Sequence, residues 1–413
     1  MALGTGQTER ESSRWGPIVG LALVASANQM LWLNFTPITS GAATHLGVSK
    51  SAIGWLSEIF PLLYVVLAVP VGRALDRWFR PTLLAGATLT AAGALVRISD
   101  QRYGVILAGQ ALIALGQPAI LNAITGTASR YLVTGHRPLG IAVGSAGTFL
   151  GFVAAFVLGA AYGASRLGSI LDVSAAYAGL SLVVLAVCLT ASAREHAAPP
   201  GVEISSQALR DLWADRVVRT LCALVFVGFG AFIALTTWVE TLLKPAGVSS
   251  STTDTLLTVM VVAGVVGCAV IPPFAANRRL QAPVILASAV ASVVSGVLLA
   301  SAPGVAAGAI ALPLTGLLVL PDLPIVLELA ERRAGGSAGA VTALLWLAGN
   351  AGGIVVALIV QALQNQPAAA FLVIGAAGGV AVPFALRLGQ QLRLEQAPST
   401  SGDGLPPLAE PTT

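Results

Sequence analysis

Charged residues are scarce in this sequence. Asp, Glu, Lys and Arg make up 10% of its 413 residues, whereas hydrophobic residues make up 56%. Soluble globular domains carry about 25% charged residues, so this scarcity excludes that class of protein. The mean hydropathy of +0.84 indicates an integral membrane protein instead.

Cysteine and histidine are scarce too, with three residues of each type. Cys188, Cys222 and Cys268 all fall within apolar segments, which indicates small buried residues and no disulfide framework. The histidines are far apart and lie in expected loops, so we expect neither a metal site nor a cofactor. Because no expected membrane span holds a histidine that would activate a nucleophile, we also expect no enzyme activity.

Long apolar runs are what the sequence has in abundance. A helix needs roughly 20 apolar residues to cross a bilayer core of about 30 Å. Twelve runs approach or exceed that length and are bounded by charged residues or by Gly and Pro. The expected membrane helices are 17–40, 51–73, 81–98, 104–128, 138–162, 173–193, 217–242, 252–275, 282–301, 305–329, 337–363 and 367–388.

The basic residues segregate between the loops that these spans create. With both termini in the cytoplasm, 17 of the 22 Lys and Arg residues fall in inner segments. The positive-inside rule therefore predicts an even number of helices in the plasma (inner) membrane, with both ends cytoplasmic. The basic clusters are short and form no stripe, so we expect no nucleic-acid partner. The five remaining basic residues are Lys50, Arg97, Arg102, Arg166 and Lys244.

The spans predict an all-α membrane protein with five parts, which we expect to be monomeric. The first helix follows a polar stretch without a cleavage pattern, so we expect it to be retained as the insertion signal. The longest internal polar interval, "REHAAPPGVEISSQALRDLWAD", is compatible with a linker containing a short amphipathic helix. The parts are a cytoplasmic tail (1–16), an N-terminal six-helix bundle (17–193), a cytoplasmic linker (194–216), a C-terminal six-helix bundle (217–388) and a disordered cytoplasmic tail (389–413).

Two short matches indicate an internal repeat. "THLGVSKSAIGWL" begins at residue 44 and "KPAGVSSSTTDTL" at residue 244, an offset of 200. "AGTFLGFV" (146–153) matches "AGNAGGIV" (348–355) at an offset of 202. Agreement in offset and in helix position predicts two pseudo-symmetric, parallel six-helix copies. This is the arrangement of major facilitator transporters, in which the substrate site lies near the midplane between the halves.

The loop after the second expected helix contains "GRALDRWFR". It resembles the major facilitator signature G-x-L-A-D-R-x-G-R-R, with Gly72, Asp76, Arg77 and Arg80 in register and Phe79 where the family usually has Gly. The resemblance implies a cytoplasmic gate motif in which Asp76 and the arginines hold the inner side shut. The alternative is a simple cluster of inner positive charge.

The stretch "WLNFTPITSGAATHLGVSKSAIGWLS" resembles a narrower group, the feline leukaemia virus subgroup C receptor-related transporters and their prokaryotic relatives. The shared pattern is an aromatic and amide pair, Gly-Val-Ser, and Ala-Ile-x-Trp-Leu-Ser. "GAFIALTTWVETLL", "VVAGVVG" and "LPIVLE" extend the similarity. Members of that family are associated with choline and ethanolamine transport, with haem in older proposals, and with facilitated movement.

The resemblance implies a substrate site in which Trp32 is an aromatic wall, with Gln117 and Asn350 as polar residues. All three lie near the centres of their expected helices. Ile233 stands where choline-handling relatives carry Tyr, so a cage for a quaternary ammonium would lose one wall. The expected substrate-binding residues are Asn28, Gln29, Trp32, Gln117, Phe232, Ile233, Trp346 and Asn350.

Polar groups inside the spans have structural alternatives as well. Asn28 and Gln29 share a helix edge with Trp32 and either face the substrate or form interhelical hydrogen bonds. Gly147 with Gly151, and Gly349 with Gly353, are small residues four apart at which helices approach closely, either for packing or at a rocking interface.

Acidic residues within the spans are candidates for coupling or gating. Asp322 lies between Pro321 and Pro324, and its expected role is to bind a substrate cation, to carry a proton or to move a gate. A structural bond to a neighbouring helix is the alternative. Glu58 is expected near the outer side, where Arg97 is a candidate partner, and Glu328 matches the family's acid in the tenth helix.

The sequence therefore predicts a secondary transporter that moves a small polar or cationic metabolite by alternating access, with facilitated movement as one form of it. Proton-coupled efflux of a drug or metabolite is the second interpretation, with Asp322 as its test. A transporter-like sensor that does not transport is a lesser alternative. The expected partners are a small-molecule substrate and the lipid bilayer.

Overall fold

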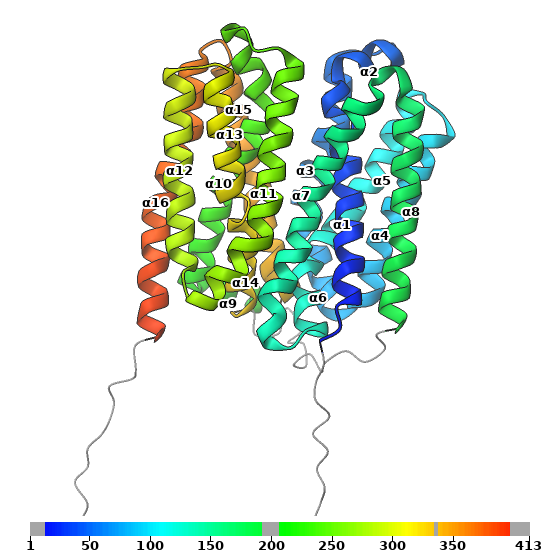
Figure 1. The fold of residues 1–413 in the computed structure, drawn as a ribbon. Helices are drawn as coiled ribbons and strands as arrows, with labels where there is room; N and C mark the ends of the chain where they lie inside the picture. The colour runs from blue at the N-terminus through cyan, green and yellow to red at the C-terminus, as the bar shows by residue number, and fades with distance from the viewer. Residues whose placement is uncertain (1–12, 192–205, 334–337, 397–413) are drawn as a thin grey trace, which may run out of the picture.

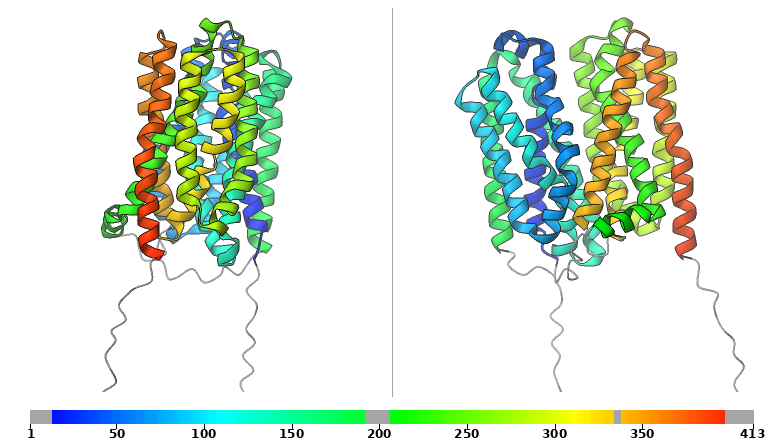
Figure 2. Two further views of the ribbon diagram at one scale, coloured as in Figure 1. Left: turned by 60° about the vertical axis from the view of Figure 1, so that its left-hand side comes forward. Right: turned by 180° about the vertical axis from the view of Figure 1, so that it is seen from behind.

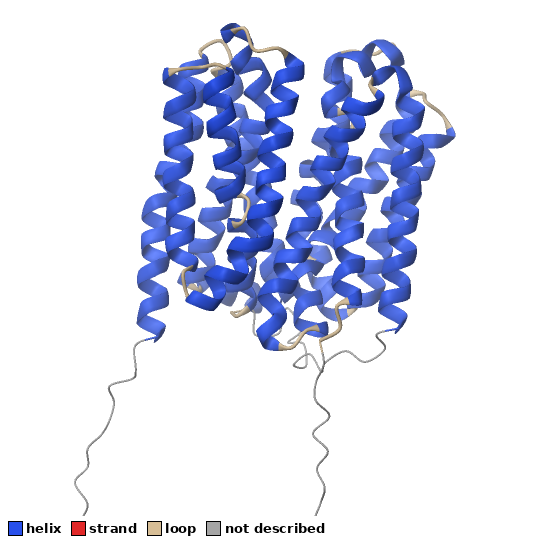
Figure 3. Cartoon of the chain, viewed as in Figure 1, coloured by secondary structure: helices blue, strands red, loops and turns tan. Residues whose placement is uncertain are grey.

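The computed structural model describes residues 13–191, 206–333 and 338–396. Within these ranges all regular secondary structure is helical (Figure 3). In the part of the chain that the structure describes, twelve helical segments are long and apolar enough to cross a membrane, which agrees with the number expected from the sequence. The protein is therefore a multi-pass α-helical membrane protein.

The helices from the first half of the chain form one bundle, drawn in blue to green in Figure 1. Short 3₁₀ turns join several of them, at Thr36–Ile38, Thr134–His136 and Ala164–Arg166. The helices are α1 (Gly16–Leu33), α2 (Thr39–Leu46), α3 (Lys50–Arg77), α4 (Phe79–Ser99), α5 (Tyr103–Leu121), α6 (Ala123–Tyr131), α7 (Arg137–Tyr162) and α8 (Leu167–Ala191).

The second half forms a similar bundle beside the first (Figures 1 and 2). A short helix, α9 (Ser206–Ala214), precedes it and packs on its first long helix. The start of α1 and the end of the last helix lie at the same end of the molecule, called here the terminal end (Figure 1). The helices are α10 (Arg216–Leu243), α11 (Ser250–Arg278), α12 (Gln281–Ser301), α13 (Val305–Val319), α14 (Asp322–Glu331), α15 (Ala338–Ala362) and α16 (Pro367–Gln396).

One span in each bundle is interrupted. The break between α5 and α6 falls at Asn122, and the break between α13 and α14 falls at Leu320 and Pro321. Proline has no amide hydrogen, so Pro321 and Pro324 each remove one helical hydrogen bond at the second break. Asn122 and Asp322 lie 200 residues apart, which is the offset of the internal repeat.

Glycines set the closest helix crossings inside each bundle. A side chain at Gly151 of α7 would place its Cβ 2.3 Å from the carbonyl oxygen of Ser26 on α1. A side chain at Gly352 of α15 would place its Cβ 1.9 Å from the carbonyl oxygen of Phe226 on α10. The expected pair Gly349 and Gly353 also faces α10, but the tightest contact is at Gly352 between them. These crossings pack helices within a bundle.

The ends of α1 and α16 differ most from the spans expected from the sequence. The α-helix α1 ends at Leu33, before the expected residue 40, and a 3₁₀ turn follows. Pro37 has no amide hydrogen to donate to the carbonyl of Leu33, so the helix cannot continue regularly through it. Helix α16 runs to Gln396, eight residues beyond the expected 388. Arg393 in its last turn stabilises that end through the helix dipole.

Candidate functional site

Aromatic rings connect the two bundles in the middle of the molecule. Trp32 of α1 stacks on Phe60 of α3, with ring centroids 5.6 Å apart, and meets the edge of Phe152 of α7 at 5.9 Å. Phe152 in turn stacks on Phe232 of α10, at 6.2 Å and an interplanar angle of 17°. The contact between Phe152 and Phe232 crosses from one bundle to the other.

A second aromatic path returns to the first bundle. Phe232 contacts Phe229 at 5.9 Å, and Phe229 meets Trp346 of α15 edge-on at 5.6 Å. Trp346 lies 6.2 Å from the ring of Tyr64 on α3. We call these rings the aromatic layer, and they are Trp32, Phe60, Tyr64, Phe149, Phe152, Phe229, Phe232 and Trp346. Because most of them are buried against each other, a ligand between the bundles has to separate rings to enter.

The orientation of Trp32 depends on a proline in a different helix. Pro61 in α3 has no amide hydrogen, so the carbonyl of Ser57 lacks its helical donor. The indole Nε1 of Trp32 donates to that carbonyl oxygen at 2.9 Å. The bond satisfies both groups and fixes the plane of the ring.

Some of the amide side chains expected at the site bond neighbouring helices, and others do not. Asn28 donates to the Thr90 hydroxyl at 3.0 Å and to the Ile113 carbonyl at 3.2 Å, and Gln29 donates to Asn28 at 3.2 Å. Asn28 thus holds α1 against α4 and α5, which is the interhelical alternative. Gln117 is buried, and its Nε2 has no partner among the described residues, whereas Asn350 donates to the Trp346 carbonyl at 2.8 Å.

Ile233 lies apart from the aromatic layer. Its side chain is next to Gly353, where an added Cβ would come within 3.4 Å of it. The residue therefore packs between α10 and α15 inside the second bundle. The neighbouring Phe232 is the residue of this pair that joins the layer.

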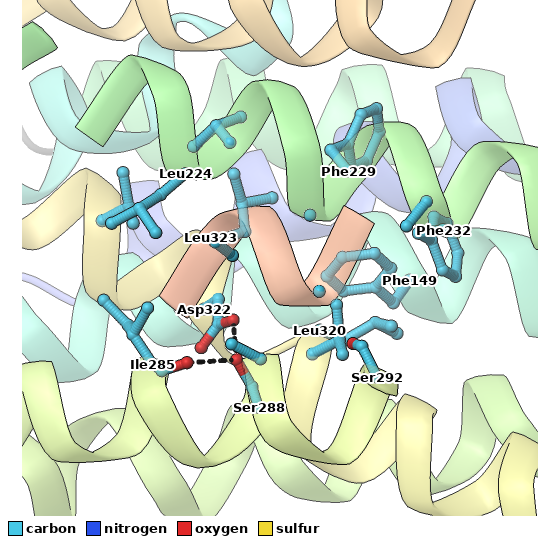
Figure 4. A pocket seen from close by; sticks show the side chains of 18 residues that line it. Phe149, Leu224, Phe229, Phe232, Ile285, Ser288, Ser292, Leu320, Asp322 and Leu323 are labelled. Atoms are coloured by element: carbon cyan, nitrogen blue, oxygen red, sulfur yellow. Dashed lines mark hydrogen bonds between the residues drawn. The ribbon is translucent and has the colours of Figure 1, made fainter. Parts of the chain in front are cut away.

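A pocket adjoins the aromatic layer on the side of the second bundle (Figure 4). It holds about 660 Å³ of empty space including its mouth. Its lining is mostly apolar and includes the rings of Phe149, Phe229 and Phe232. Its polar side chains are Asp322 of α14 and Ser288 and Ser292 of α12. A carboxyl group, two hydroxyls and aromatic faces together suit a small polar or cationic ligand.

Asp322 is half-buried, and its carboxyl group is hydrogen-bonded to Ser288 of α12. The Ser288 hydroxyl makes a short hydrogen bond with Asp322 Oδ2 and lies 2.9 Å from the carbonyl oxygen of Ile285 (Figure 4). Asp322 Oδ1 is buried with no hydrogen-bond partner among the described residues. The sequence pointed to Asp322 but not to Ser288, since a serine in an apolar helix usually bonds only its own backbone.

Polar contacts join the two bundles at the terminal end. Arg137 at the start of α7 forms an ion pair with Glu331 of α14 at 3.2 Å. The hydroxyls of Thr125 and Thr342 are 2.5 Å apart and link α6 to α15. Glu328, a candidate gating acid, makes a short ion pair with Arg332 in its own helix. This end of the contact surface is therefore closed by polar groups from both halves.

The motif from Gly72 to Arg80 forms the connection between α3 and α4 at the same end. Arg80 donates to the Tyr131 hydroxyl at 2.9 Å, which ties the connection to the end of α6. Arg77 lies over the ring of Trp78, 4.7 Å from its centroid. These two contacts of the motif lie within the first bundle.

Glu58 and Arg97 do not form the ion pair considered from the sequence. Glu58 is exposed on α3, whereas Arg97 of α4 is only 1% exposed. Arg97 donates to Gln110 Oε1 at 2.8 Å and to the Leu31 carbonyl at 3.3 Å. That carbonyl belongs to the last turn of α1, so Arg97 places a positive charge at the negative end of a helix dipole.

The fold and these contacts define the class: a twelve-span membrane protein built as two six-helix bundles around a shared central layer. Residues 21–357 match the family model described as the Major Facilitator Superfamily. The chain belongs to that superfamily, whose members are transporters and not enzymes, and whose substrates are small molecules bound within the membrane.

The similar proteins include named transporters. Solute carrier family 49 member A3 of Danio rerio is 27% identical over 274 residues, covering 62% of this chain and 57% of the relative. The choline/ethanolamine transporter FLVCR2 of Homo sapiens is 26% identical over 149 residues, covering 35% of this chain and 28% of the relative. The matched region thus spans little more than half of the first relative's length and under a third of the second's.

Solved structures agree on the fold. The fucose:proton symporter FucP of E. coli superposes with a TM-score of 0.68 at 18% identity, covering 90% of this chain and 99% of that one. The human organic anion transporter MFSD10 (TETRAN) gives 0.68 at 16% identity, covering 91% and 99%. At such identities the likeness concerns the fold alone.

Proposed function

We propose that this protein is a secondary transporter that moves a small polar or cationic metabolite by alternating access. The observation that carries the proposal is the aromatic layer, which spans both bundles and borders a pocket with one carboxyl group. Aromatic faces and a carboxylate are the groups that attract an organic cation in an apolar surrounding. The name of the human relative, a choline/ethanolamine transporter, supports a metabolite of that kind.

In the proposed topology the protein is a monomer in the plasma membrane. Both of its termini lie in the cytoplasm. Under this topology the contacts of Arg137 with Glu331 and of Thr125 with Thr342 lie on the cytoplasmic side. The ribbons of the two bundles stand farther apart at the opposite end (Figure 1). The conformation is then closed to the cytoplasm, and transport requires these contacts to break while the outer ends approach.

Within this proposal the substrate contacts are divided among three groups. Trp32 and Phe232 form the aromatic walls on the two sides, and Trp346 continues the wall on α15. Gln117 Nε2, which has no partner among the described residues, offers an amide donor, and the amide oxygen of Asn350 offers an acceptor for a polar group of the ligand. Asn28, Gln29 and Ile233 support the walls from behind and do not touch the ligand.

The test is uptake of labelled choline and of labelled ethanolamine into proteoliposomes without an imposed ion gradient. We expect saturable uptake of at least one of them, and a loss of about tenfold in apparent affinity for Phe232→Ala, equivalent to about 1.4 kcal/mol. Phe274→Ala is the matched control, because Phe274 is an exposed ring on α11 outside the layer. Equal losses in both variants, or in folded yield alone, would show that Phe232 only packs.

Proton-coupled transport is the second candidate function. It is favoured by one observation, the placement of Asp322 at the pocket with an unpaired carboxyl oxygen. A facilitator transports at the same rate with or without a pH gradient, whereas a proton-coupled transporter does not. Uptake measured with and without an imposed pH gradient separates the two.

A further inference from the structure

Arg97 of α4 and Gln110 of α5 form a buried polar pair beside the last turn of α1. The two side chains are 1% and 0% exposed. A guanidinium group only donates hydrogen bonds and a backbone carbonyl only accepts them, whereas a carboxamide does both. The oxygen of the Gln110 amide accepts from Arg97 Nη1 at 2.8 Å, so its nitrogen faces backbone carbonyls instead. Arg97 therefore sets the orientation of the Gln110 amide.

Both amide hydrogens of Gln110 are used. Its Nε2 donates to the Leu31 carbonyl of α1 at 3.0 Å and to the Leu56 carbonyl of α3 at 3.1 Å. Leu31 directly precedes Trp32 in the chain. Leu56 directly precedes Ser57, whose carbonyl accepts from Trp32 Nε1 at 2.9 Å. The Gln110 bridge and the indole hydrogen bond thus join the same two helices one residue apart, and a shift of α1 against α3 breaks both.

We infer that Gln110, oriented by Arg97, is a positioning residue that holds the Trp32 ring in the orientation that a ligand meets. One hydrogen bond changes an equilibrium by only about fivefold, so the indole bond alone leaves the ring easily displaced. The Gln110 bridge keeps the Ser57 carbonyl within reach of the indole. The inference rests on the proposed function, because the orientation of Trp32 affects transport only if this ring contacts the substrate.

Arg97 is itself fixed on the side away from Gln110. Its guanidinium carbon lies 5.2 Å from the centroid of the Phe35 ring, and Nη1 also donates to the Leu31 carbonyl at 3.3 Å. Its stem packs on Gly109, where an added Cβ would come within 2.5 Å of the Arg97 Cγ. An arginine inside a membrane span is costly and needs such contacts. Because the guanidinium is fixed, the direction that it imposes on the amide is fixed as well.

The second bundle has an apolar contact where the first has this bridge. Leu256 of α11 lies 200 residues after Leu56, which is the offset of the internal repeat. It faces Gly308 of α13, where an added Cβ would come within 2.8 Å of the Leu256 side chain. The aromatic wall of that half is Phe232, 200 residues after Trp32, and a phenylalanine has no N–H group to orient. The polar bridge therefore belongs to the half whose aromatic wall carries a hydrogen-bond donor.

The substitution that tests the bridge is Gln110→Glu. A glutamate keeps an oxygen for Arg97 but loses both donors to the backbone carbonyls. Asn122→Asp is the matched control, because Asn122 lies 12 residues later on the same span and its amide donates to the Ala68 carbonyl of α3 at 3.0 Å. It also removes an amide donor to α3, but at a point roughly 18 Å further along the helix.

The first experiment follows Trp32 in the ligand-free protein by fluorine NMR, with 5-fluorotryptophan in place of the seven tryptophans. Trp32→Phe assigns the Trp32 resonance. We expect that resonance to broaden or split in Gln110→Glu, because the ring exchanges between orientations, and to stay sharp in Asn122→Asp. An unchanged resonance in Gln110→Glu, or equal broadening in both variants, would overturn the inference. If Gln110→Glu does not fold, Arg97→Lys replaces it under the same two outcomes, since a lysine keeps the charge and loses the planar fork that orients the amide.

The second experiment is a double-mutant cycle on the uptake of choline or ethanolamine into proteoliposomes. We expect Gln110→Glu to raise KM about fivefold with the maximal rate unchanged. In a Trp32→Phe background, whose ring has no N–H group, the same exchange should change KM by less than about twofold. An equal change in both backgrounds would assign Gln110 to packing and overturn the inference. Absence of saturable uptake by the wild type would overturn the proposed function, and the fluorine spectra then decide whether Gln110 positions Trp32.

Discussion

The two bundles share an architecture but differ in how their interiors are held together. In the first bundle, long buried polar side chains bridge helices: Asn28 joins α1 to α4 and α5, and Gln110 joins α5 to the carbonyls of Leu31 and Leu56. In the second bundle short hydroxyls also form such bridges, for example Ser295 on the Ala311 carbonyl at 3.2 Å. The second bundle also contains the pocket.

This difference indicates that the two halves have different roles. Hydrogen bonds from buried amides to neighbouring helices are costly to rearrange inside an apolar bundle, so those of Asn28 and Gln110 fix α1, α3, α4 and α5 of the first half. Small hydroxyls, and the carboxyl oxygen of Asp322 that has no partner among the described residues, leave the pocket of the second half free to respond to a ligand or a proton. The first half then contains a fixed group of helices, and the second half contains the responsive pocket.

The largest expected effect is on stability, and it concerns the close helix crossings at glycine that both halves contain. Gly352→Ala and Gly151→Ala each push a methyl group against a backbone oxygen that cannot turn aside. We expect each to lower the free energy of unfolding by about 3 kcal/mol, measured as a fall in the thermal unfolding midpoint in detergent. Gly179→Ala on α8 is the control, since nothing lies within 4 Å of its added Cβ. A small effect at only one site would show that the two crossings are not equivalent.

The next prediction compares the effects on stability of substitutions in the two interrupted spans. Asn122→Ala leaves the Tyr64 hydroxyl buried without its acceptor and should cost about 2 kcal/mol of stability. Asp322→Asn keeps a donor for Ser288 and should change stability by less than about 1 kcal/mol. The same thermal measurement compares them, with Tyr64→Phe combined with Asn122→Ala expected to recover part of the loss. Similar losses at Asn122 and Asp322 would remove the contrast between a rigid and a responsive half.

A smaller effect is expected for the proline that orients Trp32. Pro61→Ala supplies an amide hydrogen that competes with the indole for the Ser57 carbonyl. We expect an affinity loss of about fivefold for the transported ligand, equivalent to roughly 1 kcal/mol, with folded yield preserved. Pro70→Ala in the same helix is the control, measured in the same uptake assay. A loss of equal size at Pro70 would assign the effect to helix stiffness.

The smallest effect concerns the contact between the halves at the terminal end. The side chains of Arg137 and Glu331 are 30% and 10% exposed, so their ion pair is partly screened. Removing it with Glu331→Gln should favour separation of this end by no more than about 1 kcal/mol. Spin labels on the two bundles at this end would report the shift, and the exchanged pair Arg137→Glu with Glu331→Arg should restore the distance. No recovery in the exchanged pair would show that the charges do not act together.

The number of spans and the fold class followed from composition and from charge segregation, because twelve long apolar runs leave few alternatives in a bilayer. The repeat at an offset of 200 residues also predicted the pairing of the halves. Helix ends were harder: Pro37 ends α1 early, and nothing in the run from 17 to 40 shows this except that single residue.

The site was only partly accessible from the sequence. Trp32, Phe232 and Trp346 were predicted as substrate contacts, and the structure joins them in one aromatic layer. Phe60 and Phe152 were missed, since a phenylalanine in a membrane helix faces lipid as often as a site. Asn28 was expected either to face the substrate or to bond a neighbouring helix, and its amide bonds α4 and α5 in this structure; a contact with a substrate stays a prediction, because sequence spacing defines a helix face and not the neighbour that the face meets.

Because of Phe149, the shape of the pocket depends on the conformation of the whole protein. Among the described lining residues it is the one contributed by the first bundle, while all others belong to the second. Any rocking of one bundle against the other therefore moves a wall of the pocket and changes its volume. A compound that fills the pocket and presses on Phe149 would act as a wedge, and its binding strength would differ between the two ends of the transport cycle.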